Sequence, residues 1–134
     1  MKLSEAILMN PRSIDKDCNL TLVDKNIQTI DKIDSLKLLN FKSLILSKNK
    51  ITSLTNISQF KLLRELNIED NLIASIKEIL YLRNLTHLEI LYISGNPLCS
   101  QFPNFRPMVI HFLRSSLKEL DSLSITADEI LQSG

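Results

Sequence analysis

The chain has 134 residues, 44% of them apolar, and its 16 basic and 15 acidic residues give a formal net charge of +1 at pH 7. These proportions are typical of one globular domain and give no bias toward nucleic acid or a membrane surface. No window approaches the roughly 18 apolar residues of a membrane-spanning helix. The first nine residues are too short an apolar run, and too acidic, for a secretory signal. We therefore expect an intracellular, cytoplasmic protein without a membrane partner.

The first predicted element is a short helix over residues 3–9. It ends before Pro11, because proline lacks the backbone N–H that a helix interior uses. A first strand and a turn containing Asn26 follow, and we expect residues 1–17 to form an N-terminal cap. The inward positions predicted for this strand are Cys18, Thr21 and Val23. The outward positions predicted for it are Leu20, Leu22 and Asp24.

Three further segments share one pattern, L-x-x-L-x-L-x-x-N-x-I/L, in which alternating apolar residues precede an asparagine. The alternation has the period of two of a half-buried strand. A repeat length of roughly 20–29 residues with this pattern indicates leucine-rich repeats. We therefore predict an α/β, right-handed solenoid of about four repeats over residues 18–98, with parallel strands on its concave face. The asparagines, spaced by 22–25 residues, are Asn26, Asn49, Asn71 and Asn96.

These asparagines are interpreted as structural. Each lies in the turn after a strand, where the next coil would bury backbone groups, and an amide side chain offers two donors and an acceptor to them. An unpaired buried polar group costs roughly 1–3 kcal/mol. We therefore predict a hydrogen-bonded ladder that binds no partner and contains Asn26, Asn49, Asn71 and Asn96.

The segments that return along the convex side are expected to differ. In the second repeat, apolar residues recur at every third position up to Phe60, which suits a 3₁₀ turn. In the third repeat, Ser75 and Glu78 have the spacing of a capping box, which predicts a short amphipathic α-helix from Ile76 to Arg83. This helix explains the longer spacing to Asn96.

Residues 99–134 are expected to form a C-terminal cap that completes a single domain over residues 1–134. A loop with two prolines precedes a predicted helix over residues 108–113. Thr126 to Glu129 is a second capping box, which opens a final helix. Caps of this kind cover sheet edges that would otherwise promote aggregation. An incomplete fifth repeat is predicted from Leu117, Leu120 and Asp121.

No arrangement of residues points to catalysis, a cofactor or a metal ion. Two glycines cannot form a phosphate-cradling loop, and neither His87 nor His111 has a partner at metal-ligand or triad spacing. Cys18 and Cys99 lie about three repeats apart, too far to form a disulfide, and are interpreted as reduced packing residues. We expect no enzyme activity, no cofactor, no metal and no nucleic-acid partner. The carboxylates considered for acid–base chemistry and set aside are Asp34, Glu65, Glu69 and Asp70.

The outward strand positions form the candidate binding surface. One column is apolar except at Asn67, and an acidic cluster of Glu65, Glu69 and Asp70 lies beside it. Exposed apolar residues ringed by charge are typical of protein-binding surfaces. The alternative is that the C-terminal cap loop covers the aromatic end of this column. The predicted partner-binding residues are Leu22, Ile45, Glu65, Asn67, Glu69, Ile90 and Tyr92.

The Asn96-Pro97 exit followed by a helical cap resembles the intracellular SDS22-like leucine-rich repeat family. The start at Met1 to Leu3 and the stretches 71–82 and 88–99 are similar to the cilia- and flagella-associated members of the basal body. The cap segments 105–109 and 126–129 are similar as well, so that the resemblance covers nearly the whole chain. It implies a non-enzymatic scaffold needed for assembly or maintenance of a cilium or flagellum, with a NIMA-related kinase as a partner.

Two other functions stay open. A nuclear or spliceosomal scaffold of the same family would need a basic concave rim, whereas Glu65, Glu69 and Asp70 are acidic. A phosphatase regulatory subunit is the other alternative. The resemblance also implies a linker and an oligomerising helix after residue 134, so we expect this domain to be monomeric and the full-length protein to oligomerise.

Overall fold

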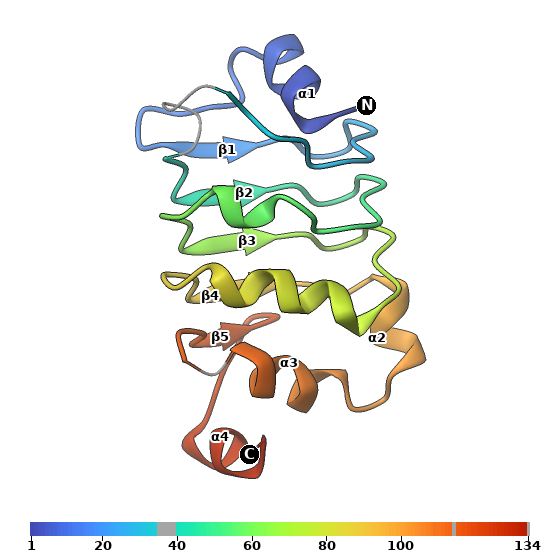
Figure 1. Ribbon diagram of the computed structural model, residues 1–134, viewed down its shortest axis with the longest axis vertical. Coiled ribbons are helices and arrows are strands. Elements are labelled where there is room, and N and C mark those ends of the chain that lie inside the picture. The colour runs from blue at the N-terminus through green and yellow to red at the C-terminus, as the bar shows by residue number, and fades with distance from the viewer. Residues whose placement is uncertain (35–39, 114, 134) are drawn as a thin grey trace.

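A computed structural model describes residues 1–34, 40–113 and 115–133. Within them, six strands form one sheet in chain order, and the first five are parallel. Figure 1 shows the parallel strands stacked along the long axis of the molecule, one for each coil of the chain. The predicted α/β solenoid is therefore confirmed. The strands are β1 Asn19–Thr21, β2 Ser43–Ile45, β3 Glu65–Asn67, β4 Ile90–Tyr92, β5 Glu119–Leu120 and β6 Leu123–Ser124.

A column of buried leucines, one from the centre of each coil, forms the axis of the core. The strand register aligns each leucine with the next, and none is exposed to solvent. Burying such a side chain contributes roughly 1.5–3 kcal/mol, and a single coil cannot bury its own inward face. Stacking of neighbouring coils therefore stabilises the fold. The column consists of Leu20, Leu44, Leu66, Leu91 and Leu120.

The register of the first coil corrects the prediction by one residue. Leu20 and Leu22 are fully buried, although they were expected to face outward. Thr21 is exposed and Val23 is half-buried, although they were expected to face inward. A one-residue slip moves every side chain of a strand to the other face, and the observed register buries two leucines instead of a threonine and a valine. Cys18, also predicted inward, is exposed.

The convex returns of the second and third repeats are 3₁₀ helices, η2 at Ile57–Gln59 and η3 at Ile76–Asn84. They appear as green and yellow coils on the same face of the sheet in Figure 1. The 3₁₀ turn of the second repeat is confirmed, whereas the α-helix predicted for the third is wrong. Its capping box does not close either. The Ser75 hydroxyl accepts a hydrogen bond from the Lys77 N–H, while the Glu78 carboxylate accepts one from the Leu54 N–H of the preceding coil.

The N-terminal end is covered by α1, Leu3–Met9, as predicted. Leu3 and Ala6 are fully buried against the first coil. The Leu3 N–H donates to the Thr29 carbonyl oxygen at 2.9 Å. The Ser4 backbone N–H and hydroxyl both donate to the Asp31 carboxylate. These bonds fix α1 across the end of the stack.

Three helices and a strand hairpin form the C-terminal end. The final helix opens with the predicted capping box, because the Glu129 N–H donates to the Thr126 hydroxyl and the Thr126 N–H donates to the Glu129 carboxylate, both at 3.1 Å. β5 confirms the partial fifth repeat, but neither the antiparallel β6 nor the first of the three helices was predicted. The middle helix begins three residues earlier than predicted. The helices are α2 Pro97–Gln101, α3 Phe105–Leu113 and α4 Ala127–Ser133.

Two remaining features concern the chain as a whole. Within the described residues, no helix combines the length and apolar character needed to cross a membrane. The boundaries proposed for the caps at residues 17 and 98 stay predictions.

Candidate functional site: the outward face of the sheet

Three columns of side chains cover the outward face of the sheet, which we call the concave face. The strand register aligns the first two columns, and backbone hydrogen bonds between successive coils continue the parallel pairing into the third. The first column contains Asn19, Ser43, Glu65, Ile90 and Glu119. The middle column contains Thr21, Ile45, Asn67 and Tyr92. The third column contains Val23, Ser47, Glu69 and Ser94.

Six of the seven predicted binding residues lie together on this face. Ile45, Asn67 and Tyr92 are neighbours in the middle column, and Glu65 and Ile90 are neighbours in the first. All are half-buried, as is Glu69, so each presents part of its side chain to solvent. The C-terminal cap therefore leaves Ile90 and Tyr92 partly accessible. The residues brought together are Ile45, Glu65, Asn67, Glu69, Ile90 and Tyr92.

Leu22 does not belong to this surface. It is fully buried in the core, because the register of the first coil places Thr21 and Val23 on the concave face instead. The signal that could have revealed this register is the spacing to Ile27. In the other repeats the buried aliphatic residue follows two positions after the ladder residue, which places Lys25 rather than Asn26 at the ladder position.

The asparagine ladder is confirmed in the second, third and fourth coils. Each side-chain oxygen accepts a backbone N–H of the preceding coil, from Ile27, Ile51 and Ile73 respectively, at 3.0–3.1 Å. Each amide nitrogen donates to carbonyl oxygens of its own coil and of the preceding one. The three buried ladder residues are Asn49, Asn71 and Asn96.

Asn26 is not part of the ladder. It is exposed and adopts a positive φ of 59°. The ladder position of the first coil is occupied by Lys25, whose backbone N–H donates to the Asn49 side-chain oxygen at 2.9 Å. Among the described residues no parallel strand precedes β1 in the sheet, so an amide side chain is not required at the turn of the first coil to bridge to one.

Two carboxylates of the concave face are held by neutral donors. The Ser43 hydroxyl donates to Glu65 Oε1 at 2.8 Å. The Ser94 hydroxyl donates to Glu69 Oε2 at 2.8 Å, and Asn67 Nδ2 donates to Glu69 Oε1 at 3.2 Å. None of the ion pairs among the described residues involves Glu65, Glu69 or Asp70. The Glu65 and Glu69 side chains are therefore oriented by neutral donors, without an ion pair from the described part of the chain.

The remaining candidates for chemistry lie apart from one another. Within residues 1–34, 40–113 and 115–133, no group of three or more histidine, cysteine, aspartate or glutamate side chains is placed to hold a metal ion. His87 and His111 are both exposed. Cys18 and Cys99 are free thiols, as predicted, and burial raises the pKa of the Cys99 thiol. The packing role predicted for Cys18 is wrong because its side chain is exposed.

Comparison with solved structures supports the fold. The chain superimposes on a chain of the crystal structure of the Drosophila melanogaster SNF/U2A' complex with a TM-score of 0.68, covering 99% of this chain and 90% of that one. The sequence identity is 20%, so this likeness concerns the fold alone. Leucine-rich repeat solenoids use extended concave surfaces for binding.

Comparison of sequences agrees with the resemblance inferred from the residues. Residues 61–107 match the family model of leucine-rich repeats in two copies. The chain is 32% identical over 85 residues to cilia- and flagella-associated protein 410 of Mus musculus and 33% identical over 85 residues to the Homo sapiens protein of that name. Each match covers 63% of this chain but only 34% or 33% of the relative, so the chain spans about a third of their length. The chain therefore has a leucine-rich repeat fold, and its sequence is similar to that of cilia- and flagella-associated protein 410.

Proposed function

We propose that this protein is a non-enzymatic scaffold that binds a protein partner on its concave face at the base of a cilium or flagellum. The main support for this binding surface is the middle column, in which Ile45, Asn67 and Tyr92 lie next to one another on three adjacent strands. A half-exposed tyrosine between an aliphatic residue and polar neighbours has the composition of a protein-binding hot spot.

The charges of this face favour a basic partner segment. Glu65 and Glu69 are oriented by hydroxyl and amide donors, and no ion pair among the described residues involves either of them. Complementary charges increase the association rate and select among partners. A segment that places an apolar side chain near Tyr92 and a lysine or arginine near Glu69 fits both features of the surface.

The ciliary location is proposed because the two relatives described above carry that association in their names. A NIMA-related kinase is a candidate partner to test directly because the sequence resemblance implies one. A tagged full-length protein in a ciliated cell should concentrate at the basal body. Concentration in the nucleus would instead favour the spliceosomal scaffold, and recovery of a phosphatase catalytic subunit would favour the regulatory subunit.

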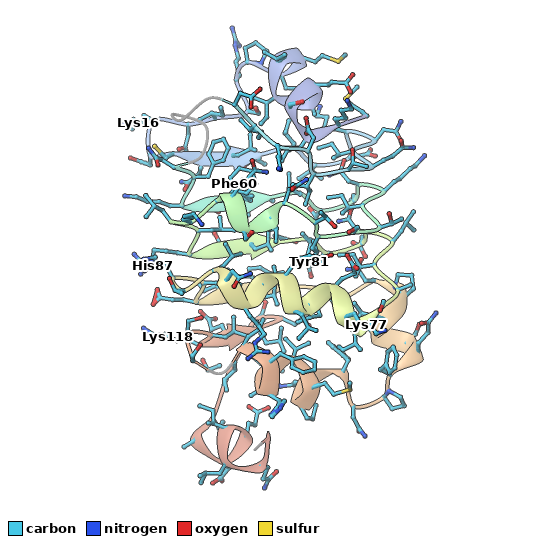
Figure 2. The ribbon with its side chains drawn as sticks, in the orientation of Figure 1. Lys16, Phe60, Lys77, Tyr81, His87 and Lys118 are labelled. Carbon is cyan, nitrogen blue, oxygen red and sulfur yellow. The ribbon has the colours of Figure 1, made fainter. Side chains whose placement is uncertain are left out.

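The concave face can be tested by a double variant on that face and a tyrosine variant on the convex side. Tyr92→Ala combined with Glu69→Lys should abolish proximity labelling of the partner set while preserving the folded state. The matched control is Tyr81→Ala, because Tyr81 lies on the convex η3 with 40% of its surface exposed (Figure 2). Labelling that survives the concave double variant, or is lost equally in the convex control, would refute the proposed surface.

A further inference from the structure

One edge of the sheet, where the strands begin, aligns a row of charged side chains. Here each carbonyl oxygen accepts two N–H groups from the following coil. The Arg64 carbonyl accepts from Glu89 and Ile90 at 2.9 and 3.0 Å, and the Glu89 carbonyl accepts from Lys118 and Glu119 at 2.8 and 3.0 Å. The Lys42 carbonyl is bonded in the same way. These backbone hydrogen bonds fix the order of the row independently of any side-chain contact. The row consists of Lys42, Arg64, Glu89 and Lys118.

The side chains of this row are dominated by positive charge. Glu89 is shared between two cations, with Arg64 Nη2 at 2.6 Å from one carboxylate oxygen and Lys118 Nζ at 2.9 Å from the other. The Arg64 and Lys118 side chains are 65% and 73% exposed. His87 and Lys118 lie along the same side of the molecule in Figure 2. Two cations around one carboxylate leave a net positive charge.

These groups line a hollow of about 480 Å³. Its other lining side chains carry hydroxyls or an imidazole, and Glu89 is the acidic member of the lining. Arginine has five N–H donors and lysine three, and the bonds to Glu89 use only part of this capacity. The hollow therefore offers many donors to an incoming anion. Its lining consists of Arg64, Thr86, His87, Glu89, Ser115, Ser116 and Lys118.

The pKa of the Glu89 carboxyl reflects the positive charge around it. Hydrogen bonds from Lys118 and Arg64 lower the pKa of its carboxyl to about 2. The bridge itself is exposed, and exposed ion pairs contribute little to stability because water and salt screen them. A more highly charged oxyanion can therefore displace the Glu89 carboxylate from the two cations without unfolding the chain.

A second hollow adjoins the first and gives room for a peptide chain. It has a volume of about 330 Å³ and shares Ser115 with the first hollow. Its other lining residues are Arg83, His111 and Phe112. Phe112 is half-buried, so part of its ring is accessible to a neighbouring side chain.

We propose that the strand-start edge binds the phosphomonoester group of a phosphorylated serine or threonine in a protein partner. Arg64 and Lys118 hold the phosphate oxygens in place of Glu89, His87 and the hydroxyls of Ser115 and Ser116 line the rest of the hollow, and residues flanking the phosphate occupy the second hollow. The site lies at the edge of the sheet and is separate from the concave face, so the two proposals can succeed or fail independently.

A single dianion fits this site better than a nucleic acid does. Phosphate recognition by arginine and lysine donors is the strongest class of hydrogen bond available to the edge. Single-stranded nucleic acids are bound largely by stacking of bases on aromatic side chains. Apart from the His87 imidazole, the first hollow contains no aromatic ring among its described lining residues.

The test is a titration of the isotope-labelled 134-residue chain, followed by amide NMR, with a five-residue peptide that carries a central phosphoserine. We expect saturable shifts at Arg64, His87, Ser116 and Lys118, and much weaker shifts with the unphosphorylated peptide. Arg64→Gln combined with Lys118→Gln should weaken binding by about tenfold or more. Glu89→Gln should strengthen binding, because it removes the carboxylate that competes for both cations.

The matched control removes two exposed cations elsewhere, by Lys50→Gln combined with Lys77→Gln. This variant has the same net charge as the edge variant and should bind the phosphopeptide as the wild type does. Equal weakening in both double variants, or no saturable shift up to about 10 mM peptide, would overturn the proposal. Tighter binding of a uridine decamer at the same residues would overturn it in favour of a nucleic-acid surface.

Discussion

The middle coils and the two ends of this solenoid satisfy the buried backbone groups of their turns with different side chains. In the second to fourth coils, one residue type at one position satisfies the buried turn, as Asn49, Asn71 and Asn96 show. At the C-terminal end the carboxylate of Asp121 accepts the N–H groups of Ile93 and Ser94 at 2.7 and 3.1 Å. The interior of the stack is periodic, whereas each end uses a chemistry of its own.

This difference has a consequence for stability. An interior coil packs against two neighbours, so loss of one of its side chains disturbs contacts on both sides. A cap packs on one side only and faces water on the other. Changes of the same chemical type should therefore cost more in the interior than in the caps, and three measurements can sharpen or break this comparison.

The largest effect is expected from a pair of leucine truncations. Leu66→Ala removes a fully buried side chain in β3 and should lower the free energy of unfolding by about 2–5 kcal/mol. Leu131→Ala in the cap helix α4 removes a side chain that is 77% exposed and should change it by less than about 0.5 kcal/mol. Urea denaturation followed by circular dichroism measures both. Similar costs would contradict the assigned register and the comparison.

A smaller effect is expected from a pair of asparagine substitutions. Asn71→Ala leaves the Ile51 N–H and the Leu46 and Ile68 carbonyl oxygens without their side-chain partner. An unsatisfied buried group costs about 1–3 kcal/mol, and the same denaturation experiment should show a loss of at least that size. Asn26→Gly is the control, because Asn26 is exposed and glycine readily adopts its positive φ. A large loss of unfolding free energy in the control would instead indicate that Asn26 has a ladder-like structural role.

The smallest effect is expected at the C-terminal cap and depends on pH. Hydrogen bonds from Arg106 and Thr126 hold the pKa of Glu129 below its ordinary value of 4.5. Because the folded-state pKa is lowered, the stabilisation of α4 is present above pH 4.5 and is lost as the pH falls through the folded value. Backbone chemical shifts of α4 should therefore move toward coil values in acid.

The 3₁₀ helix η2 provides the internal reference for this titration, since it contains no carboxyl side chain and its shifts should stay constant over the same pH range. Arg106→Gln removes the Nε donor that lies 2.8 Å from Glu129 Oε2. In this variant the transition of α4 should move to higher pH. An unchanged transition would show that Arg106 does not hold the cap.

Sequence reasoning works where the repeat is complete and fails where it is not. The alternation around Leu44, Leu66 and Leu91 is flanked by a correctly spaced asparagine, so several independent signals agree on one register. In the first coil, Leu20 and Val23 allow either register by hydrophobicity alone, and Asn26 favours the wrong one. The six predicted binding residues that lie on the concave face come from complete repeats, and the misplaced Leu22 comes from the incomplete one.

The remaining errors arise from contacts between coils. Ser75 and Glu78 have the spacing of a capping box, yet the Glu78 carboxylate accepts the Leu54 N–H of the preceding coil, and the Ser75 hydroxyl accepts the N–H of Lys77 instead of that of Glu78. The hairpin of β5 and β6 turns at Asp121 and Ser122, which both adopt positive φ. Neither residue is a glycine, so the usual local signal of such a turn is missing. The strand-start row likewise depends on the alignment of coils far apart in the chain.

The direction of the asparagine ladder bears on how the chain is made. The turn of each coil receives its side-chain acceptor from the coil that follows, as Ile27 does from Asn49 and Ile51 does from Asn71. During synthesis the N-terminal part leaves the ribosome first. The turn of the newest coil therefore lacks its side-chain acceptor while the following coil is still inside the exit tunnel. Structure along the nascent chain consequently trails the emergence of the chain from the ribosome by the length of one repeat.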